Sequence, residues 1–477
     1  MHTRLVRALP GRWATVTAIA VIAIVIVVTR LPALGGGEYD YDEGVYWLSL
    51  QSMQAGHPLF SAVYSSQPPA FLLFAQPPWA LLGASITAAR AVMLAWAVVG
   101  VTAGSVIAWR LGGRAAAVAA AVVLAVDPLM VRQSIVLQAD GPATSLALVA
   151  VAMAALAVTV RPPRWAAAAA AGAGAALVTG VLTKLFDVAA IPPLVALLAL
   201  SPMWRRLAIA ACAGALLAAA VILLPLHGAW AAIWNDSVGL HVNTRSITYG
   251  ISLGDALAQR WYLEVIAAAG AVFGWRRHRR LVITGLVWVA GGVAAMAATT
   301  PLWQHHAVSL SPGLALLVAA GVSSVATSLV RGGMPAMPWS AATLGAAALA
   351  GSGVILVSGL GQLQASNDFG PIVSRLSQAT SASAEVLGDE QFAQALAHRP
   401  APPQFVDTSH TRLIGSGVTA QQLEDTASRD PVCAVLFATG RMASVPGFEA
   451  WVAAHYPERL DAGSGRSLYV IPGCARP

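Results

Sequence analysis

Long apolar runs separated by short polar segments dominate the first 360 residues of the chain. A helix needs about 20 mainly apolar residues to cross a bilayer. The pattern therefore predicts a polytopic α-helical membrane protein with about 11 to 13 transmembrane helices. The predicted spans are residues 13–33, 91–109, 115–128, 142–160, 165–183, 186–200, 207–224, 260–275, 281–298, 307–328 and 340–360, and residues 70–83 form a further, doubtful one.

The pattern changes near residue 365, where polar residues and turn formers return. Short apolar runs predict strands at 384–387, 404–407, 432–438 and 467–471, and helical patterns occur at 420–428 and 448–455. Strands that alternate with helices indicate an α/β domain. We therefore divide the chain into a membrane domain at 1–364, with its first outer loop at 35–69, and a small soluble α/β domain at 365–477.

Composition and charge place this chain in a membrane. Hydrophobic residues make up 57% and charged residues only 10%, which excludes an ordinary soluble protein. The net charge of +7 comes from clusters in short loops, which favours cytoplasmic loops over a nucleic-acid surface. We predict an odd number of crossings of the plasma membrane, with residues 70–83 forming a short or re-entrant segment. This topology puts every basic cluster on the cytoplasmic side and the C-terminal domain on the extracytoplasmic side. The clusters are Arg4, Arg7 and Arg12; Arg110 and Arg114; Arg161 and Arg164; Arg205 and Arg206; and 276–280.

An acidic segment directly after the first apolar run contains the leading candidates for chemistry. Asp42 and Glu43 begin a stretch whose apolar spacing predicts an amphipathic helix on the membrane surface. Carboxylates at a membrane boundary are costly unless they face water, a cation or a reaction. Acids at a helix start also serve as caps, so capping and catalysis both remain open for this pair.

Asp140 is a second acid at a predicted outer boundary. Two carboxylates from separate outer loops are able to share a site in which one is a base and the other orients it. Oxygen ligands from Asp42, Glu43 and Asp140 also suit a hard divalent cation such as Mg²⁺ or Mn²⁺. No cofactor is certain from the sequence.

Six motifs follow one another along the chain: YDEGVYWLSLQSMQAGHPLF, YSSQPPAFLLF, the Gly-Gly-Arg turn, Asp140, GVLTKLF and PLWQHHAVSLSPGLALL. Their order resembles the GT-C type glycosyltransferases that use polyprenyl-phosphate sugars, the group of protein O-mannosyltransferases and aminoarabinose transferases. The resemblance covers about residues 13–330. It implies that Asp42 is the catalytic base, Glu43 its partner and Asp140 a site or metal-linked residue. The lipid A transferases carry Glu-Lys where Ser66 and Gln67 stand here.

A sugar donor of this kind leaves as polyprenyl phosphate, so the site needs cationic or hydrogen-bonding groups. Each candidate also has a structural alternative: Lys184 extends its charge to the interface, Arg132 pairs with Asp127 or Asp140, and the histidines are satisfied interfacial residues. Tyr64 and Gln67 are further candidates for substrate binding. The cationic candidates, all predicted at outer helix ends, are Arg132, Lys184, Arg245, His305 and His306.

We therefore predict a membrane glycosyltransferase that moves a sugar from a polyprenyl-phosphate donor to an extracytoplasmic acceptor hydroxyl on a glycan, lipid or protein. The alternatives are a transporter or flippase of an anionic lipid or solute, and an envelope assembly protein. The first apolar run lacks a small-x-small cleavage pattern and is predicted to be an uncleaved anchor. Cys433 and Cys474 pair if the C-terminal domain is extracytoplasmic.

Overall fold

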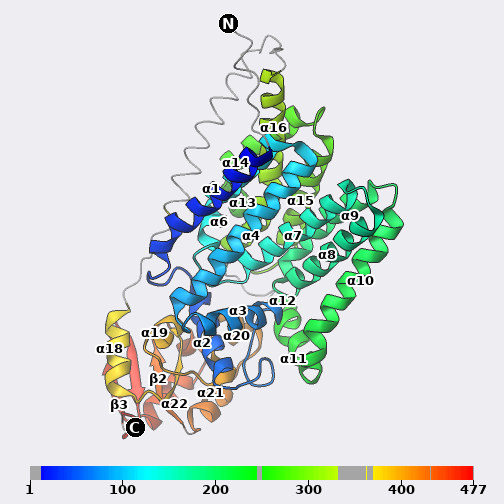
Figure 1. The fold of residues 1–477 in the computed structure, drawn as a ribbon. Coiled ribbons are helices and arrows are strands. Elements are labelled where there is room, and N and C mark those ends of the chain that lie inside the picture. Colours follow the sequence, from blue (N-terminus) through cyan, green and yellow to red (C-terminus); the bar gives the residue numbers. More distant parts are fainter. Residues whose placement is uncertain (1–11, 244–249, 331–360, 362–368, 430, 476–477) are drawn as a thin grey trace.

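The computed structural model describes residues 12–243, 250–330, 361, 369–429 and 431–475. The predicted span 340–360 and Arg245 lie outside these residues. A bundle of long helices makes up most of the molecule, and the C-terminal domain caps one end of it (Figure 1). The loops and short helices of the first outer loop lie between the two parts.

The membrane part is helical almost throughout, as predicted. In chain order its helices are α1 (Arg12–Arg30), η2 (Leu31–Ala33), α2 (Tyr41–Gln54), α3 (Ala70–Leu81), α4 (Ile86–Gly112), α5 (Arg114–Val126), α6 (Pro128–Gln133), α7 (Asp140–Thr159), α8 (Pro163–Val181), η3 (Leu185–Ala190), α9 (Ile191–Ala199), α10 (Trp204–Leu223), η4 (Leu224–Ala229), α11 (Trp230–Trp234), η5 (Asn235–Gly239), α12 (Leu240–Asn243), α13 (Leu253–Ala258), α14 (Trp261–Gly274), α15 (Arg279–Ala297), η7 (Gln304–Leu310) and α16 (Ser311–Val330).

Six helical segments in the described part of the chain are long and apolar enough to cross a membrane, and four shorter apolar helices accompany them. The predicted number of 11 to 13 crossings is therefore not confirmed. The doubtful segment forms α3, which has 12 residues. At 1.5 Å per residue it spans only about 18 Å, too short for a bilayer core of about 30 Å.

Small residues let the helices approach closely. Gly174 of α8 faces the backbone of Ala211 in α10, and Gly214 of α10 faces the backbone of Ala171 in α8. A Cβ atom at either glycine would collide with the neighbouring carbonyl group. Close backbone contact through small residues is a common way to pack helices in lipid, where apolar burial contributes little. The alanine-rich stretch of α8 is thus a packing surface.

The C-terminal domain contains a four-stranded mixed sheet in the order β1-β2-β4-β3. β1 and β2 are parallel, whereas β4 runs antiparallel to both β2 and β3. The predicted strand at 404–407 is wrong: this segment contains a 3₁₀ turn, because Pro402 and Pro403 fix φ and donate no hydrogen bond. The elements are α18 (Gly370–Ala379), β1 (Glu385–Gly388), α19 (Gln391–Leu396), η8 (Pro403–Phe405), α20 (His410–Gly415), α21 (Ala420–Ala427), β2 (Val432–Phe437), η9 (Met442–Ser444), α22 (Phe448–His455), β3 (Glu458–Asp461) and β4 (Ser467–Val470).

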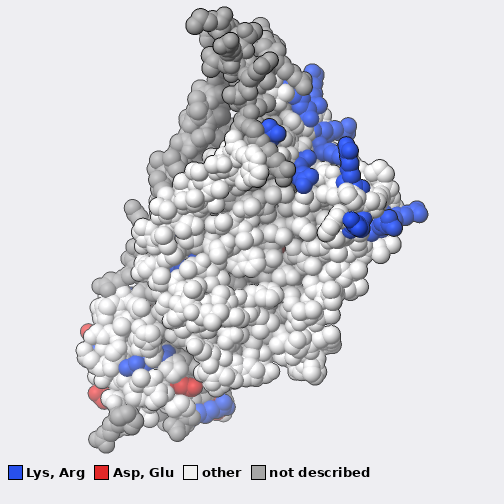
Figure 2. All heavy atoms as spheres, in the orientation of Figure 1, with Lys and Arg blue, Asp and Glu red and all other residues white. Residues whose placement is uncertain are grey.

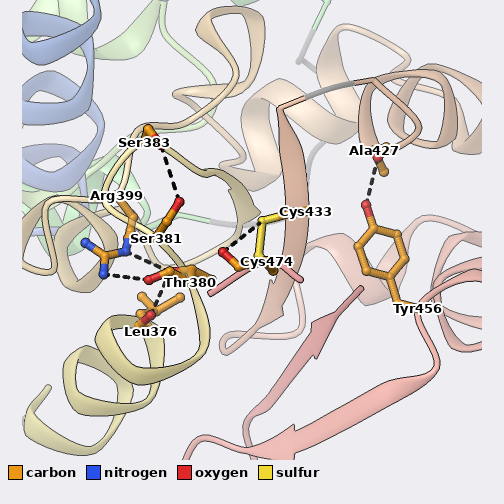
Figure 3. The surroundings of a disulfide bond; sticks show 9 residues. All are labelled: Leu376, Thr380, Ser381, Ser383, Arg399, Ala427, Cys433, Tyr456 and Cys474. Carbon is orange, nitrogen blue, oxygen red and sulfur yellow. Dashed lines mark hydrogen bonds between the residues drawn. A yellow bond between two sulfur atoms is a disulfide. The ribbon is translucent and has the colours of Figure 1, made fainter. Parts of the chain in front are cut away.

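A disulfide bond joins Cys433 of β2 to Cys474 beyond β4 (Figure 3). The backbone N–H of Ser381 donates to the carbonyl of Cys474 over 2.8 Å, which ties the chain after α18 to the same place. The Arg399 guanidinium reinforces this corner by donating to the hydroxyl and the carbonyl of Thr380. The pairing that the sequence left open for these two cysteines is present, and it joins two positions that are 41 residues apart in the chain.

The first outer loop packs against the C-terminal domain and shares a hydrophobic core with it. Gly44 of α2 touches the backbone of Gln391 and Phe392 in α19 so closely that no Cβ atom fits. Trp47 meets the Phe392 ring edge-on at 5.7 Å. The residues from Glu43 to Leu50 are buried, so the prediction of a half-exposed helix on the membrane surface is wrong. The C-terminal domain of the same chain covers the face of α2 that the sequence pattern assigned to solvent.

Charge is distributed unevenly along the molecule. Figure 2 shows Lys and Arg side chains gathered at the end of the helical part away from the C-terminal domain, whereas the domain itself carries both signs. Helices α5, α8, α10 and α15 each carry arginines in their first turn. The middle of the molecule is almost free of charge in this view, as expected for a surface that faces lipid.

Candidate active site

Asp40, not Asp42 or Glu43, caps the N-terminus of α2. The Asp40 side chain accepts a hydrogen bond from the backbone N–H of Asp42 over 3.2 Å, and its own backbone is extended as an N-cap requires. Arg132 of α6 donates to the other Asp40 oxygen over 2.7 Å. The cap is therefore provided two residues before Asp42, which leaves the Asp42 carboxylate available.

Glu43 is part of a buried ion pair that anchors the first outer loop. The Arg90 guanidinium of α4 donates to both Glu43 oxygens, over 2.8 and 2.7 Å, and neither side chain is exposed. The backbone N–H groups of Tyr39 and Leu137 donate to the same carboxylate. Arg90 also donates to carbonyls of the loop after η2. Glu43 thus has its lone pairs occupied by the protein.

Asp42 lies beside Glu43 but has a different environment. It is half-buried and forms no ion pair among the described residues, and its nearest hydrogen-bond donor is the Gln138 amide at 3.5 Å. Burial, the neighbouring Asp40, Asp407 and Asp140 raise the pKa of Asp42 to about 8, although Lys184 opposes them. A carboxylate with a pKa near neutrality is suited to accept a proton from a substrate.

Asp140 begins α7 and pairs with Lys184, which lies just before η3, over 2.7 Å. Both side chains are almost fully buried, so Lys184 does not extend its charge to the interface as one alternative proposed. The Gln138 amide that approaches Asp42 precedes Asp140 by two residues. The two acids that the sequence selected from separate outer loops therefore meet at one site.

The histidines of η7 lie on the same side of the site as Lys184. His305, His306 and Asp140 have potential ligand atoms within 4.8 Å of one another. The backbone N–H of Trp303 donates to His306 Nδ1 over 3.2 Å, so in the neutral ring the proton is on Nε2. The Phe186 ring stacks on His306 at 4.2 Å. His306 is therefore arranged to donate a hydrogen bond from Nε2.

A divalent cation does not fit the predicted ligands Asp42, Glu43 and Asp140. Arg90 occupies both oxygens of Glu43, and Lys184 pairs with Asp140. The trio of Asp140, His305 and His306 is no better suited, because metal binding through His306 Nε2 would require the proton on Nδ1, where Trp303 already donates. These residues fit an anion that accepts hydrogen bonds better than a cation.

Three further candidates are placed as follows. Arg132 pairs with Asp40 and not with Asp127 or Asp140, because Asp127 caps α6 and pairs with Arg260. Tyr64 is buried under the Arg412 guanidinium of α20, which lies 3.8 Å from the ring centroid. Gln67 is buried in a turn with Ser65, and its side chain makes no hydrogen bond to the site carboxylates among the described residues.

Sequence analysis missed Arg90, Gln138 and the contribution of the C-terminal domain, notably Asp407. Arg90 could have been found, because a lone arginine near one end of a long apolar run is costly unless it is paired. Gln138 and Asp407 have no comparable feature in the sequence, since amides and acids in polar segments are common. Only the folded chain, which brings distant segments together, places them near Asp42.

Fold and site together define a multi-pass membrane protein of the GT-C type fold, with an acidic and cationic site between the helix ends and a soluble domain. The predicted GT-C-like fold is confirmed by solved structures. ArnT from Cupriavidus metallidurans bound to undecaprenyl phosphate superimposes with a TM-score of 0.67 at 12% identity, over 96% of this chain and 99% of that one.

Two other solved structures share the fold. The oligosaccharyltransferase of Archaeoglobus fulgidus in its apo form has a TM-score of 0.58 at 12% identity, over 90% of this chain and 70% of that one. Arabinofuranosyltransferase AftD from mycobacteria has a TM-score of 0.54 at 16% identity, over 90% of this chain and 35% of that one. No protein-family model and no curated protein sequence matches the chain.

Proposed function

We propose that this protein is a plasma-membrane glycosyltransferase that moves a sugar from a polyprenyl-phosphate donor to an acceptor hydroxyl outside the cytoplasm. The observation that carries the proposal is the half-buried Asp42 carboxylate, which forms no ion pair with any residue that the structure describes and lies beside the buried Lys184 and Asp140. The fold shared with ArnT, crystallised with undecaprenyl phosphate, supports a lipid-phosphate donor.

The charge distribution supports an extracytoplasmic site. Lys and Arg gather at the end of the helical part away from the C-terminal domain (Figure 2), and such clusters favour the cytoplasmic side. The site and the C-terminal domain then lie outside. A disulfide bond in that domain is consistent with an oxidising compartment. Outside the cell nucleotide sugars are absent, so a lipid-linked donor is the natural source of activated sugar.

In the proposed reaction Asp42 takes the proton from the acceptor hydroxyl as its oxygen attacks the anomeric carbon of the donor. The bond between that carbon and the phosphate oxygen breaks, and the electron pair leaves with polyprenyl phosphate. A single displacement of this kind inverts the anomeric centre. Glu43 takes no part in proton transfer, since Arg90 holds it, and instead keeps α2 in position.

Lys184, His305 and His306 are proposed to stabilise the leaving phosphate. The Lys184 ammonium group has further donors besides the one used by Asp140, and His306 Nε2–H is directed by the hydrogen bond at Nδ1. Donors fixed before the reaction stabilise developing negative charge without reorganisation. Arg132 acts through Asp40, which it orients beside His305.

The transporter hypothesis is less well supported by this arrangement. Transporters place ionisable residues and broken helices near the middle of the membrane. Here the ionisable site lies where the helices meet the C-terminal domain, and the first outer loop is fixed to that domain through Gly44 and Trp47.

The proposal is tested with purified protein in lipid nanodiscs and labelled polyprenyl-phosphate sugars. Wild-type protein should release polyprenyl phosphate, and Asp42→Asn should reduce the rate by at least about 1,000-fold, typical of the loss of a catalytic base. Glu424→Gln, on the C-terminal domain away from the site, is the control. Full activity of Asp42→Asn would remove the assignment of the base, and failure of the wild type with every such donor would remove the function.

A further inference from the structure

Asp407 is a second carboxylate at the site, and it comes from the C-terminal domain. It lies between η8 and α20, is 4% exposed, and accepts a hydrogen bond from the backbone N–H of Ser409 over 2.8 Å. No lysine or arginine forms an ion pair with it in the described parts of the chain. A buried carboxylate without a counter-ion costs free energy, so its retention requires a reason.

Two arginines lie near Asp407 but are directed elsewhere. Arg412 of α20 stacks on Tyr64 at 3.8 Å, and Arg441 before η9 stacks on Tyr41 at 3.6 Å. Both tyrosines belong to the first outer loop, and Tyr41 directly precedes Asp42. The stacking therefore attaches the C-terminal domain to the first outer loop at Tyr41 and at Tyr64, and neither guanidinium forms an ion pair with Asp407 among the described residues.

Asp407 lies close to the first turns of α2. Its neighbour Thr408 accepts a hydrogen bond from the Gln391 side chain, and the backbone of Gln391 touches Gly44, two residues after Asp42. The negative charge of Asp407 also contributes to the raised pKa of Asp42, after burial and Asp40. Residues four apart lie on the same face of a helix, so Tyr46 lies on the same face of α2 as Asp42. The Tyr46 ring meets Phe71 of α3 at 4.8 Å.

We propose that Asp407 is a specificity-determining residue that accepts a hydrogen bond from a second hydroxyl of the acceptor, next to the hydroxyl that Asp42 deprotonates. The acceptor is then a molecule with neighbouring hydroxyl groups, such as a sugar residue of a glycan. This inference rests on the proposed function. In this arrangement the donor binds on the side of the site that faces the membrane helices, and the acceptor binds on the side formed by the C-terminal domain.

The distribution of charge favours this division. The groups proposed to bind phosphate all come from the membrane part: Lys184 directly precedes η3, and His305 and His306 lie in η7. The C-terminal domain contributes Asp407 at the same site. A carboxylate repels phosphate but accepts hydrogen bonds from hydroxyl groups. Arg412 and Arg441 close by make a neutral polyol a better ligand there than a divalent cation.

The test measures transfer from a labelled polyprenyl-phosphate sugar to two probes, a methyl hexopyranoside and 1-propanol, by full-length protein in nanodiscs. Wild-type protein should prefer the glycoside by at least about tenfold, the discrimination that one well-placed hydrogen bond provides. Asp407→Asn should raise the KM for the glycoside and reduce this preference by at least about tenfold. Asp425→Asn, an exposed acid in α21, is the matched control and should change neither rate.

The outcomes separate this inference from the proposed function. The inference is overturned if the wild-type protein uses the glycoside and 1-propanol equally, or if Asp407→Asn keeps the wild-type preference. The proposed function stands in both cases. Absence of any transfer or donor release by the wild type overturns both. A requirement for Mn²⁺ that is lost in Asp407→Asn would identify a cation site and overturn the polyol assignment.

A second variant covers the case in which Asp407→Asn does not fold. Asp407→Glu keeps the charge but moves the carboxylate outward by one methylene group. It should raise the KM for the glycoside with a smaller change in kcat, because the acceptor is held in a shifted position. An unchanged KM in folded Asp407→Glu contradicts the inference.

Discussion

Glu43 and Asp42 are adjacent residues of α2, but the surroundings of their carboxylates differ in burial and in hydrogen-bond partners. Glu43 is fully buried, bound by two of the three guanidinium nitrogens of Arg90 and by two backbone N–H groups. Asp42 is half-buried, and among the described residues its carboxylate has one long contact, to Gln138. The same difference separates Asp127, which pairs with Arg260, from Asp407, which forms no ion pair in the described part of the chain. Pairing, rather than residue type, separates the structural acids from those that we propose to contact substrate.

The largest expected effect comes from breaking the buried pair. Arg90→Met leaves Glu43 buried without its counter-ion, which typically costs 3–5 kcal/mol, and it removes the donors that hold the loop after η2. We expect a strongly lowered thermal midpoint and no transferase activity. The midpoint is measured by tryptophan fluorescence of the protein in detergent.

The double variant Glu43→Gln/Arg90→Met is the matched control. It removes both charges, so it should recover part of the lost stability relative to Arg90→Met. If Glu43→Gln alone abolishes activity in a protein with wild-type stability, the distinction between the two adjacent acids is wrong.

A smaller effect is expected at the cationic side of the site. Lys184→Met removes a donor to the leaving phosphate and should lower kcat by about 100-fold, as the loss of one preorganised donor usually does. It also leaves Asp140 buried without its partner. Lys184→Met/Asp140→Asn should restore stability but not kcat. Recovery of kcat in the double variant would make the pair structural. Stopped assays of polyprenyl phosphate release provide the rates.

The smallest effects concern the charge of Asp42. Its pKa of about 8 lies above the ordinary value of 3.8, so the catalytic carboxylate form is populated only as pH rises through 8. We expect kcat/KM to increase about tenfold per pH unit below 8 and to level off above it. A flat profile between pH 6 and 8 would contradict this environment for Asp42.

The same raised pKa has a consequence for stability. Ionising Asp42 is harder in the folded protein than in the unfolded one, so its contribution to folding becomes less favourable as pH rises from about 4 to 8. Asp42→Asn should therefore raise the thermal midpoint at pH 8 relative to the wild type, while the two proteins should differ less at pH 5. A lower midpoint for Asp42→Asn at pH 8 would show that the carboxylate stabilises the fold.

Sequence analysis selected Asp42, Asp140, Lys184, His305 and His306, and the structure brings these side chains into one site. Their signal was physical, because charged residues at the ends of apolar runs are costly and therefore few. The same reasoning assigned Arg132 to the wrong partner and grouped Glu43 with Asp42 as its catalytic partner, whereas Glu43 pairs with Arg90. The acid that caps α2, Asp40, was not separated from its neighbours, since caps depend on backbone geometry at single residues.

The succession of apolar runs by itself determined the helical membrane part, and the return of polar residues determined the soluble domain, because burial in lipid and the period of a helix act locally along the chain. Only the tertiary structure decided which acid is paired, which cation faces which carboxylate, and that the C-terminal domain packs on the first outer loop. Those contacts join residues 47, 44 and 92 positions apart. A charge has no preferred partner in the sequence; its partner is whichever opposite charge packing brings within a few ångströms.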